Sequence, residues 1–304
     1  MKKLMIPFLL LLLVLLSACG NEAAEEKGAD KKEEKSTITY ESESGPVEVP
    51  ADPQRVIVLS SFAGNVMALD TKLVGVDSWS KMNPRYEGLE GVEEVTDDNL
   101  EKIIELNPDL IIGLSNIKNI DKLKEIAPTV TYTYGKVDYL TQHLEIGKLL
   151  NKEKEAQAWI DDFKNRAQTA GDDIKAKIGE DATVSVIENF DKQLYVFGDN
   201  WARGTEILYQ EMKLKMPEKV TEMALKDGFY AISAEVLPEY AGDYMIFSKN
   251  SDGDTSFQET ETYKNIPAVK NNQVFEANAK EFYFNDPISL DYQLEFFKKS
   301  FLAN

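Results

Sequence analysis

The stretch Lys152–Gly179, KEKEAQAWIDDFKNRAQTAGDDIKAKIG, decides the fold of this chain. Seven of its apolar residues recur every three or four positions, with charged residues on the remaining faces: Ala156, Ile160, Phe163, Ala167, Ala170, Ile174 and Ile178. This spacing predicts one amphipathic helix over 152–179, about 35–40 Å long. Gly171 is the position at which this helix risks a break. A single rigid helix predicts little relative motion between the parts that it joins.

Short apolar strands lie on both sides of this helix. They are predicted at 55–59, 73–76, 110–114 and 129–132 before it, and at 183–187, 194–197, 244–247 and 273–276 after it. Helical patterns separate several of these strands, which is typical of a parallel α/β layer. We therefore predict the α/β fold class, with one α/β lobe at 37–151, an interlobe helix at 152–179 and a second α/β lobe at 180–304.

A weak internal repeat relates the two predicted lobes. Glu101 lies eight residues before Asp109, and Glu235 lies eight residues before Asp243; each aspartate directly precedes an apolar strand. The repeat indicates pseudo-two-fold related lobes, each with one glutamate near the start of a helix. The same glutamates also have local explanations. Glu101 can complete a capping box with Asp98 as the N-cap, and Glu235 can be a favourable charge in a first helical turn.

The N-terminus has the features of an export signal. Two lysines precede an apolar run from Leu4 to Leu16, and the sequence Leu-Ser-Ala then leads into Cys19. The apolar run is too short for a transmembrane helix, which needs about 20 residues. We expect a signal peptide at 1–18 and a lipobox-like site at which Cys19 is acylated. A charged tether at 19–36 would then hold the protein at the extracellular face of the membrane.

The composition limits which partners and metals the protein can hold. Without residues 1–18, the 34 basic residues fall to 32 against 53 acidic ones, a net charge of −21. This charge argues against nucleic acid and against binding to anionic lipid surfaces. His143 is the only histidine and Cys19 the only cysteine, so a disulfide and most protein-built zinc, copper or haem sites are excluded. We expect no cofactor and no resident metal, and a metal would arrive already chelated.

Catalytic motifs are incomplete. The segment Gly113–Ile117 follows a predicted strand with a serine at 115 but lacks the second glycine of a nucleophile elbow. His143 flanks an apolar stripe, which favours a position at the rim of a core over a role as a base. The segment Asp252–Asp254 resembles part of a calcium loop but lacks the loop glycine and the closing glutamate. We therefore expect a protein that is not an enzyme.

Two aromatic clusters mark a candidate ligand cleft in the second lobe. The first is Leu194–Gly204, LYVFGDNWARG, at a strand end and the turn after it. The second is Glu281–Pro287, EFYFNDP, in which at least one of three consecutive aromatic residues must point away from the core. Strand ends that face a neighbouring lobe are common ligand sites. Trp and Tyr offer flat apolar surfaces, and Arg offers a fork of donors for carbonyl or carboxylate oxygens.

These motifs resemble the ferric hydroxamate siderophore-binding lipoproteins of Gram-positive ABC importers. The resemblance covers essentially the whole chain and is most specific at 194–204, 240–244 and 282–287, with further similarity at 107–112 and 126–130. It implies two α/β lobes joined by one long helix. It also implies a monomeric receptor that captures an Fe(III)–hydroxamate complex and delivers it to the importer's permease.

The resemblance also implies roles for individual residues. Arg203 would donate hydrogen bonds to hydroxamate oxygens, while Glu101 and Glu235 would dock the lobes onto arginines of the permease. Aromatic residues would pack around the ligand: Trp201, Tyr195, Tyr283, Tyr134 and Phe62. One departure is that Ala202 and Thr205 stand where the family usually has glycine, which leaves the preferred siderophore open.

Charge favours hydroxamates over catecholates independently of the resemblance. A ferric tris-hydroxamate is neutral, whereas a ferric tris-catecholate carries three negative charges and calls for a cluster of basic residues. The aromatic motif has a single arginine, Arg203. A haem or cobalamin receptor of the same fold remains an alternative, with Tyr195 or Tyr283 as a possible axial haem ligand. A tethered hydrolase is disfavoured by the missing elbow, and a direct zinc or manganese receptor by the single histidine.

Overall fold

A computed structural model describes residues 36–303, which belong to one compact unit. The predicted signal peptide at 1–18, the lipidation site Cys19 and the tether up to residue 35 lie outside the described residues. Within 36–303, no helix is both long enough and apolar enough to cross a membrane.

The first lobe, which comprises the elements before residue 153, contains a hairpin and a five-stranded parallel sheet. The hairpin is β1 (Thr37–Ser42) with β2 (Gly45–Pro50), and the sheet order is β5-β4-β3-β6-β7. The strands are β3 (Val56–Val58), β4 (Leu73–Val76), β5 (Glu93–Glu94), β6 (Leu110–Leu114) and β7 (Thr129–Tyr132). The helices are α1 (Ala63–Ala68), α2 (Ser78–Met82), α3 (Leu100–Glu105), α4 (Ile120–Ile126) and α5 (Tyr139–Leu149). All four predicted strands of this lobe are present, whereas the half-exposed hairpin and β5 were not predicted.

The second lobe has a mixed five-stranded sheet in the order β10-β9-β8-β11-β12. The strands are β8 (Val184–Phe190), β9 (Gln193–Phe197), β10 (Phe229–Ile232), β11 (Tyr244–Lys249) and β12 (Val274–Asn278). The helices are η1 (Glu206–Glu211, a π-helix), α7 (Glu218–Ala224), α8 (Leu237–Tyr240), η2 (Ser256–Glu259), α9 (Glu261–Lys264), α10 (Pro267–Lys270), α11 (Ala279–Phe282) and α12 (Pro287–Leu302). Strands β8, β11 and β12 are parallel, but β9 runs antiparallel to β8. Only two residues separate β8 from β9, and a link so short can join only antiparallel neighbours.

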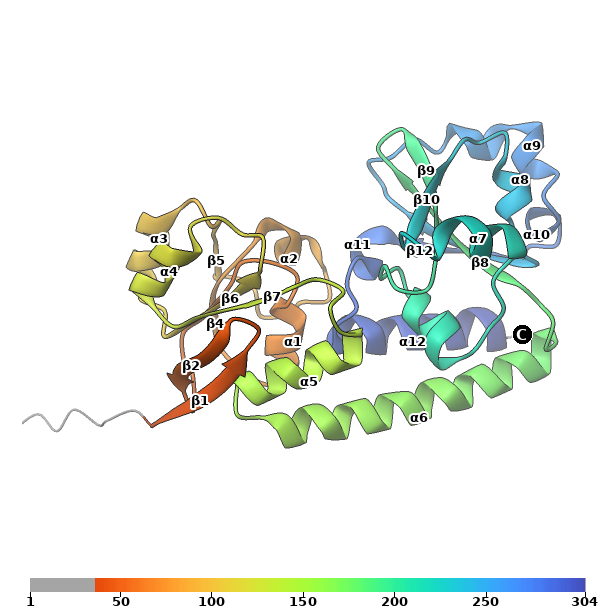
Figure 1. The fold of residues 1–304 in the computed structure, drawn as a ribbon. Helices are drawn as coiled ribbons and strands as arrows, with labels where there is room; N and C mark the ends of the chain where they lie inside the picture. The colour runs from red at the N-terminus through yellow and green to blue at the C-terminus, as the bar shows by residue number, and fades with distance from the viewer. Residues whose placement is uncertain (1–35, 304) are drawn as a thin grey trace, which may run out of the picture. The chain divides into compact units, whose positions relative to one another are not determined.

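The predicted interlobe helix is present as α6 (Glu153–Ile178), one continuous helix of 26 residues. Six of its seven predicted apolar positions are buried, and Ile178 at its end is partly buried. The helix packs along α5 and α12 (Figure 1). It continues through Gly171, where an added Cβ would lie 2.6 Å from the Cα and the carbonyl oxygen of Met212. The glycine therefore allows the chain after η1 to pack directly against the helix backbone.

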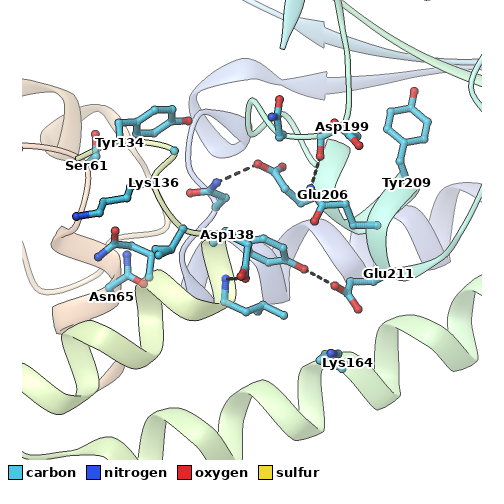
Figure 2. A pocket seen from close by; sticks show the side chains of 18 of the residues that line it. Ser61, Asn65, Tyr134, Lys136, Asp138, Lys164, Asp199, Glu206, Tyr209 and Glu211 are labelled. Carbon is cyan, nitrogen blue, oxygen red and sulfur yellow. Dashed lines mark hydrogen bonds between the residues drawn. The ribbon is translucent and has the colours of Figure 1, made fainter. Parts of the chain in front are cut away.

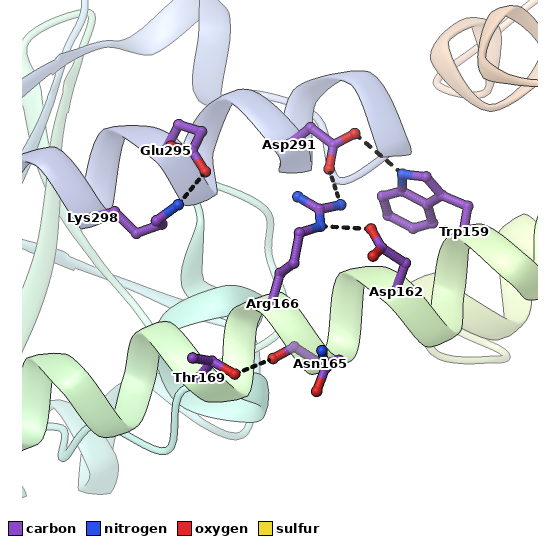
Figure 3. A network of polar contacts seen from close by, with 8 residues as sticks. All are labelled: Trp159, Asp162, Asn165, Arg166, Thr169, Asp291, Glu295 and Lys298. Atoms are coloured by element: carbon purple, nitrogen blue, oxygen red, sulfur yellow. Dashed lines mark hydrogen bonds and ion pairs between the residues drawn. The ribbon is translucent and has the colours of Figure 1, made fainter.

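Polar side chains also fix α12 to α6 (Figure 3). Arg166 donates from Nε to Asp162, 2.6 Å away, and from Nη2 to Asp291 on α12, 2.7 Å away. The indole N–H of Trp159 donates to the other carboxylate oxygen of Asp291 at 3.2 Å. The ring of Trp159 stacks on Phe163, with ring centres 4.8 Å apart. This network lies at the surface of an apolar helix pair and orients the two helices.

The segment before α12 inserts into the first lobe. The ring of Phe284 belongs to the core of that lobe and packs on Tyr86 with ring centres 5.3 Å apart. The hydroxyl of Tyr86 donates to the buried carboxylate of Asp286 at 2.6 Å. Gly64 on α1 leaves room for that carboxylate, since a Cβ there would lie 2.0 Å from Asp286 Oδ1. The lobes are therefore joined by this buried contact as well as by α6.

The internal repeat corresponds to a shared backbone contact. The carboxylate of Asp109 accepts the backbone N–H of Arg55, just before β3, at 2.8 Å. The carboxylate of Asp243 accepts the backbone N–H of Thr183, just before β8, at 2.8 Å. In each lobe the aspartate precedes a strand that pairs in parallel with that first strand. The repeat of the two aspartates is thus a structural equivalence.

The local roles predicted for the two glutamates are wrong. The N-cap of α3 is Asn99, whose side chain accepts the backbone N–H of Lys102 at 3.2 Å, and Asp98 instead pairs with Lys118. Helix α8 starts only at Leu237, so Glu235 precedes its first turn. Both sequence patterns named a suitable residue type but placed the helix start at a different residue.

Candidate functional site

An aromatic cavity of about 250 Å³ lies against the antiparallel pair of strands β8 and β9. Its lining contains six aromatic residues and one acid–base pair: Trp79, Glu188, Phe190, Tyr195, Phe197, Trp201, Arg203 and Phe229. Tyr195, Trp201 and Arg203 were predicted from the sequence, and the structure brings them together. Trp79 comes from α2 of the first lobe, so both lobes contribute to the wall.

The turn that carries Trp201 and Arg203 has an unusual backbone. Ala202, Arg203 and Gly204 have φ angles of +56°, +60° and +78°, so three successive residues are left-handed. The N–H of Arg203 donates to the carbonyl of Phe282 at 2.7 Å, and the N–H of Ala202 donates to Glu206 at 2.9 Å. These bonds hold the turn. A residue other than glycine in this region costs about 1–2 kcal/mol relative to right-handed backbone, so Ala202 makes this turn strained.

Hydrogen bonds and aromatic rings fix the position of the Arg203 guanidinium. Its Nη2 and Nε donate to the two carboxylate oxygens of Glu188 at 3.0 and 3.2 Å, and its Nη1 donates to the carbonyl of Trp201 at 3.3 Å. Ser248 on β11 donates its hydroxyl to Glu188 at 2.6 Å. The guanidinium carbon lies 4.9 Å from the ring centres of both Phe197 and Tyr283. These contacts leave one N–H on each terminal nitrogen for a ligand.

Aromatic pairs connect the walls that the two lobes contribute. Trp79 meets Tyr283 edge to face with ring centres 5.3 Å apart, and Tyr134 meets Trp201 at 5.5 Å. Trp79 is 45% exposed and Tyr134 is 46% exposed, so large ring faces remain available. Within the second aromatic cluster, Phe282 and Phe284 are buried and Tyr283 is the ring left partly exposed. The prediction that at least one of the three rings points away from the core is therefore confirmed.

Phe62 occupies a different position from the other predicted aromatic residues. Its ring is buried in the core of the first lobe and packs edge to face on Tyr132, 5.5 Å away. It reaches only the lining of a second, larger pocket. The aromatic cavity therefore forms without Phe62.

The second pocket is polar and has a volume of about 790 Å³ (Figure 2). Its lining includes charged residues of both signs from the N-cap of α5, from α6 and from η1, among them Asp138, Lys164 and Glu211. Glu206 is buried in its wall, which raises the pKa of that carboxyl although Asn285 donates to it at 2.9 Å. Tyr134 lines this pocket while its ring contacts Trp201 of the aromatic cavity. The two pockets therefore adjoin at this ring pair.

The single histidine is fully buried, deeper than the rim position that the sequence predicts. His143 is buried, its Nδ1 lies 3.1 Å from the side-chain oxygen of Asn65, and burial lowers its pKa to about 4. Ser115, the serine of the incomplete elbow motif, accepts a hydrogen bond from the hydroxyl of Thr133 at 3.0 Å. No group of three or more His, Cys, Asp or Glu side chains suited to a metal occurs within residues 36–303.

Both predicted docking glutamates are exposed. Glu101 lies in the first turn of α3, and Glu235 lies in the turn before α8. A hydrogen bond from Ser233 lowers the pKa of Glu235, so this carboxylate is charged at neutral pH. Ile104, one helical turn after Glu101, is 58% exposed.

The sequence did not single out Trp79, Glu188 or Phe229. Trp79 follows β4 in the short helix α2, where the side chain of Asp77 caps the helix. Trp201 likewise follows a strand, β9, within a few residues. This shared order of strand and tryptophan could have indicated Trp79 from the sequence. Glu188 continues the apolar run of β8 past its predicted end, and a carboxylate inside such a strand calls for a buried partner.

Comparisons with known proteins identify relatives of this chain. A family model described as periplasmic binding protein matches residues 58–281. The chain is 37% identical over 301 residues to the iron(3+)-hydroxamate-binding protein FhuD of Bacillus subtilis (strain 168), covering 96% of this chain and 95% of that protein. The solved FhuD protein from S. pseudintermedius is 35% identical with a TM-score of 0.79, covering 88% of this chain and 99% of that one. FhuD2 from Staphylococcus aureus with bound ferrioxamine B is 34% identical with a TM-score of 0.78, covering 83% and 99% of the two chains.

Proposed function

This chain belongs to the periplasmic binding protein family, and from that premise we propose that it captures Fe(III)–hydroxamate siderophores for an ABC importer. The observation that carries the ligand class is the aromatic cavity with Arg203 already paired to Glu188. Relatives named for iron(3+)-hydroxamate binding, and a relative solved with ferrioxamine B, support the same class. The iron is cargo, and the protein performs no chemistry on it.

Each part of the cavity suits one part of such a ligand. Hydroxamate oxygens around the iron accept hydrogen bonds, and the two remaining N–H groups of Arg203 can donate them. The faces of Trp201 and Tyr195, joined by the exposed ring of Tyr134, offer apolar surface to the chains that link the hydroxamates. The ring of Tyr283 lies beside the guanidinium, with its centre 4.9 Å from the guanidinium carbon. Phe62 lies in the core of the first lobe against Tyr132 and is not part of this wall.

Delivery to the permease rests on the two exposed glutamates in our proposal. Glu101 and Glu235 occupy corresponding places in the two lobes, eight residues before the aspartates that share one backbone role. Their carboxylates are suited to arginines on a two-fold related permease surface. The exposed side chain of Ile104 adds an apolar contact beside Glu101. A lipid on Cys19 would hold the monomeric receptor at the extracellular face of the membrane.

A direct titration tests the ligand class. Protein lacking residues 1–19 is titrated with a linear and a cyclic ferric tris-hydroxamate, a ferric catecholate, haemin and cobalamin, following tryptophan fluorescence. Trp79 and Trp201 line the cavity, so hydroxamates should quench saturably at submicromolar concentration. Arg203→Ala should weaken binding at least tenfold, because the cavity loses its donors and leaves Glu188 unpaired. Lys122→Ala, at an exposed position of α4 outside the linings of both pockets, is the control and should bind normally. Quenching by haemin or the catecholate alone would overturn the proposal.

A further inference from the structure

Among the residues that the structure describes, only the ion pair Glu188–Arg203 brings formal charge to the lining of the aromatic cavity. Glu188 is 1% exposed and lies on the central strand β8, out of reach of solvent. Its carboxylate accepts two donors of Arg203 and the hydroxyl of Ser248. The cavity therefore presents an arginine whose positive charge is cancelled within one hydrogen-bond length.

We propose that Glu188 is a specificity-determining residue that holds the cavity at zero net charge and so selects ferric complexes whose iron shell is neutral. This inference rests on the proposed function and adds a residue to it. An arginine without this partner would make the cavity cationic and would attract ferric complexes with anionic shells. With the partner, a charged iron shell loses its hydration without gaining a counter-charge.

At the pair Glu188–Arg203, the effect of charge can be tested separately from the effect of side-chain shape. Arg203 is also fixed by the carbonyl of Trp201 and by the rings of Phe197 and Tyr283. Glu188→Gln keeps the size of the side chain and an oxygen that can accept from Arg203, but it removes the negative charge. Two unit charges about 8–10 Å apart in a protein of effective dielectric about 20 interact strongly enough to change an equilibrium about tenfold or more. A substitution of charge alone should therefore be measurable.

The test uses one linear tris-hydroxamate loaded with either of two metals. With Ga(III) the six-oxygen complex is neutral, and with Ge(IV) the same shell carries one positive charge. The measured quantity is the ratio of the two dissociation constants, cationic over neutral, in wild type, Glu188→Gln, Arg203→Gln and the double variant. Glu276→Gln removes one acid from the exposed pair with Lys249, outside the cavity lining, and is the matched control.

The proposal predicts that the two single variants shift the ratio of dissociation constants in opposite directions and that the shifts cancel in the double variant. The ratio should rise about tenfold in Glu188→Gln, fall about tenfold in Arg203→Gln and return to near the wild-type value in the double variant, while the control stays unchanged. If Arg203→Gln does not fold because Glu188 is left unpaired, Glu188→Gln and the double variant still decide the outcome. An unchanged ratio in Glu188→Gln, or a double variant that keeps the single variant's ratio, refutes the role of Glu188. Wild type that binds neither complex overturns the proposed function and this inference together.

Discussion

Gly171 is the position at which one methyl group should most clearly disturb the interlobe helix. The structure places the backbone of Met212 where the Cβ of an alanine would lie, with Cα and the carbonyl oxygen at 2.6 Å and Cβ at 2.9 Å. These atoms belong to backbone and to a fixed side-chain root, so they cannot move aside by rotation. Gly171→Ala must therefore shift α6 away from the segment that follows η1.

The size of the effect follows from two opposing terms. Alanine is favoured over glycine inside a helix by about 1 kcal/mol. Overpacking a tight contact costs about 1–3 kcal/mol, and contact with backbone belongs at the upper end of that range. We expect a net loss of about 1–2 kcal/mol in the free energy of unfolding. For a protein of this size the loss corresponds to a fall in Tm of roughly 2–4 °C.

Thermal unfolding followed by circular dichroism measures this prediction. Ala158→Gly, at an exposed position of the same helix, is the matched control, because it changes helix propensity without altering a contact. It should lower stability by about 1 kcal/mol. Gly171→Ala should also lower stability, although its propensity change has the opposite sign. If Gly171→Ala instead raises Tm by about the amount that the control lowers it, the close approach of Met212 to the helix is refuted.

Two further predictions concern docking and pH. Replacing Glu101 and Glu235 together by alanine should abolish siderophore uptake by cells while leaving the dissociation constant of the purified protein unchanged. The control is the double variant Glu105→Ala with Glu239→Ala. Normal uptake by cells with Glu101 and Glu235 replaced would contradict the docking role. For His143, burial lowers the pKa from 6.5 to about 4, so below pH 6.5 the unfolded chain takes up a proton that the folded protein does not. Stability should therefore be lost as pH falls from 6.5 to about 4, by about 2–3 kcal/mol, and chemical unfolding at pH 7 and pH 4.5 should show that His143→Gln lacks this loss. A pH-independent difference between the variant and wild type would count against it.

The elements with a strong periodic signal could be predicted from the sequence. The helix over 153–178 and the four strands of the first parallel sheet needed only the spacing of apolar residues, because each buries one face or both. Strand β5 consists of Glu93 and Glu94, both exposed, and pairs only through its backbone. The antiparallel direction of β9 depends on a two-residue turn with Asp191 at φ +53°. Neither feature leaves an apolar period in the sequence.

The candidate site could be predicted only where its residues are neighbours in the chain. Trp201 and Arg203 were found because they share one turn with Tyr195 close by. Trp79 is brought to the same cavity by tertiary packing, and its own segment contains no second aromatic residue that would draw notice. Glu188 was passed over because a single glutamate after an apolar strand resembles a surface residue until its partner is known. Charge balance at a buried pair depends on two residues that only the fold brings together, here 15 positions apart.

The internal repeat separates structural residues from candidate functional ones. Asp109 and Asp243 accept the backbone N–H groups that precede β3 and β8, so the folding of each sheet accounts for an aspartate at that position. The same explanation does not extend to Glu101 and Glu235: neither is the N-cap of its helix, and both are exposed. Exposed residues that recur in both lobes at equal spacing are therefore candidates for contact with a partner. A partner with two-fold related basic sites would account for the recurrence, because it would contact both lobes in the same way. The uptake assay with both glutamates replaced therefore tests that explanation more directly than any measurement on the isolated protein.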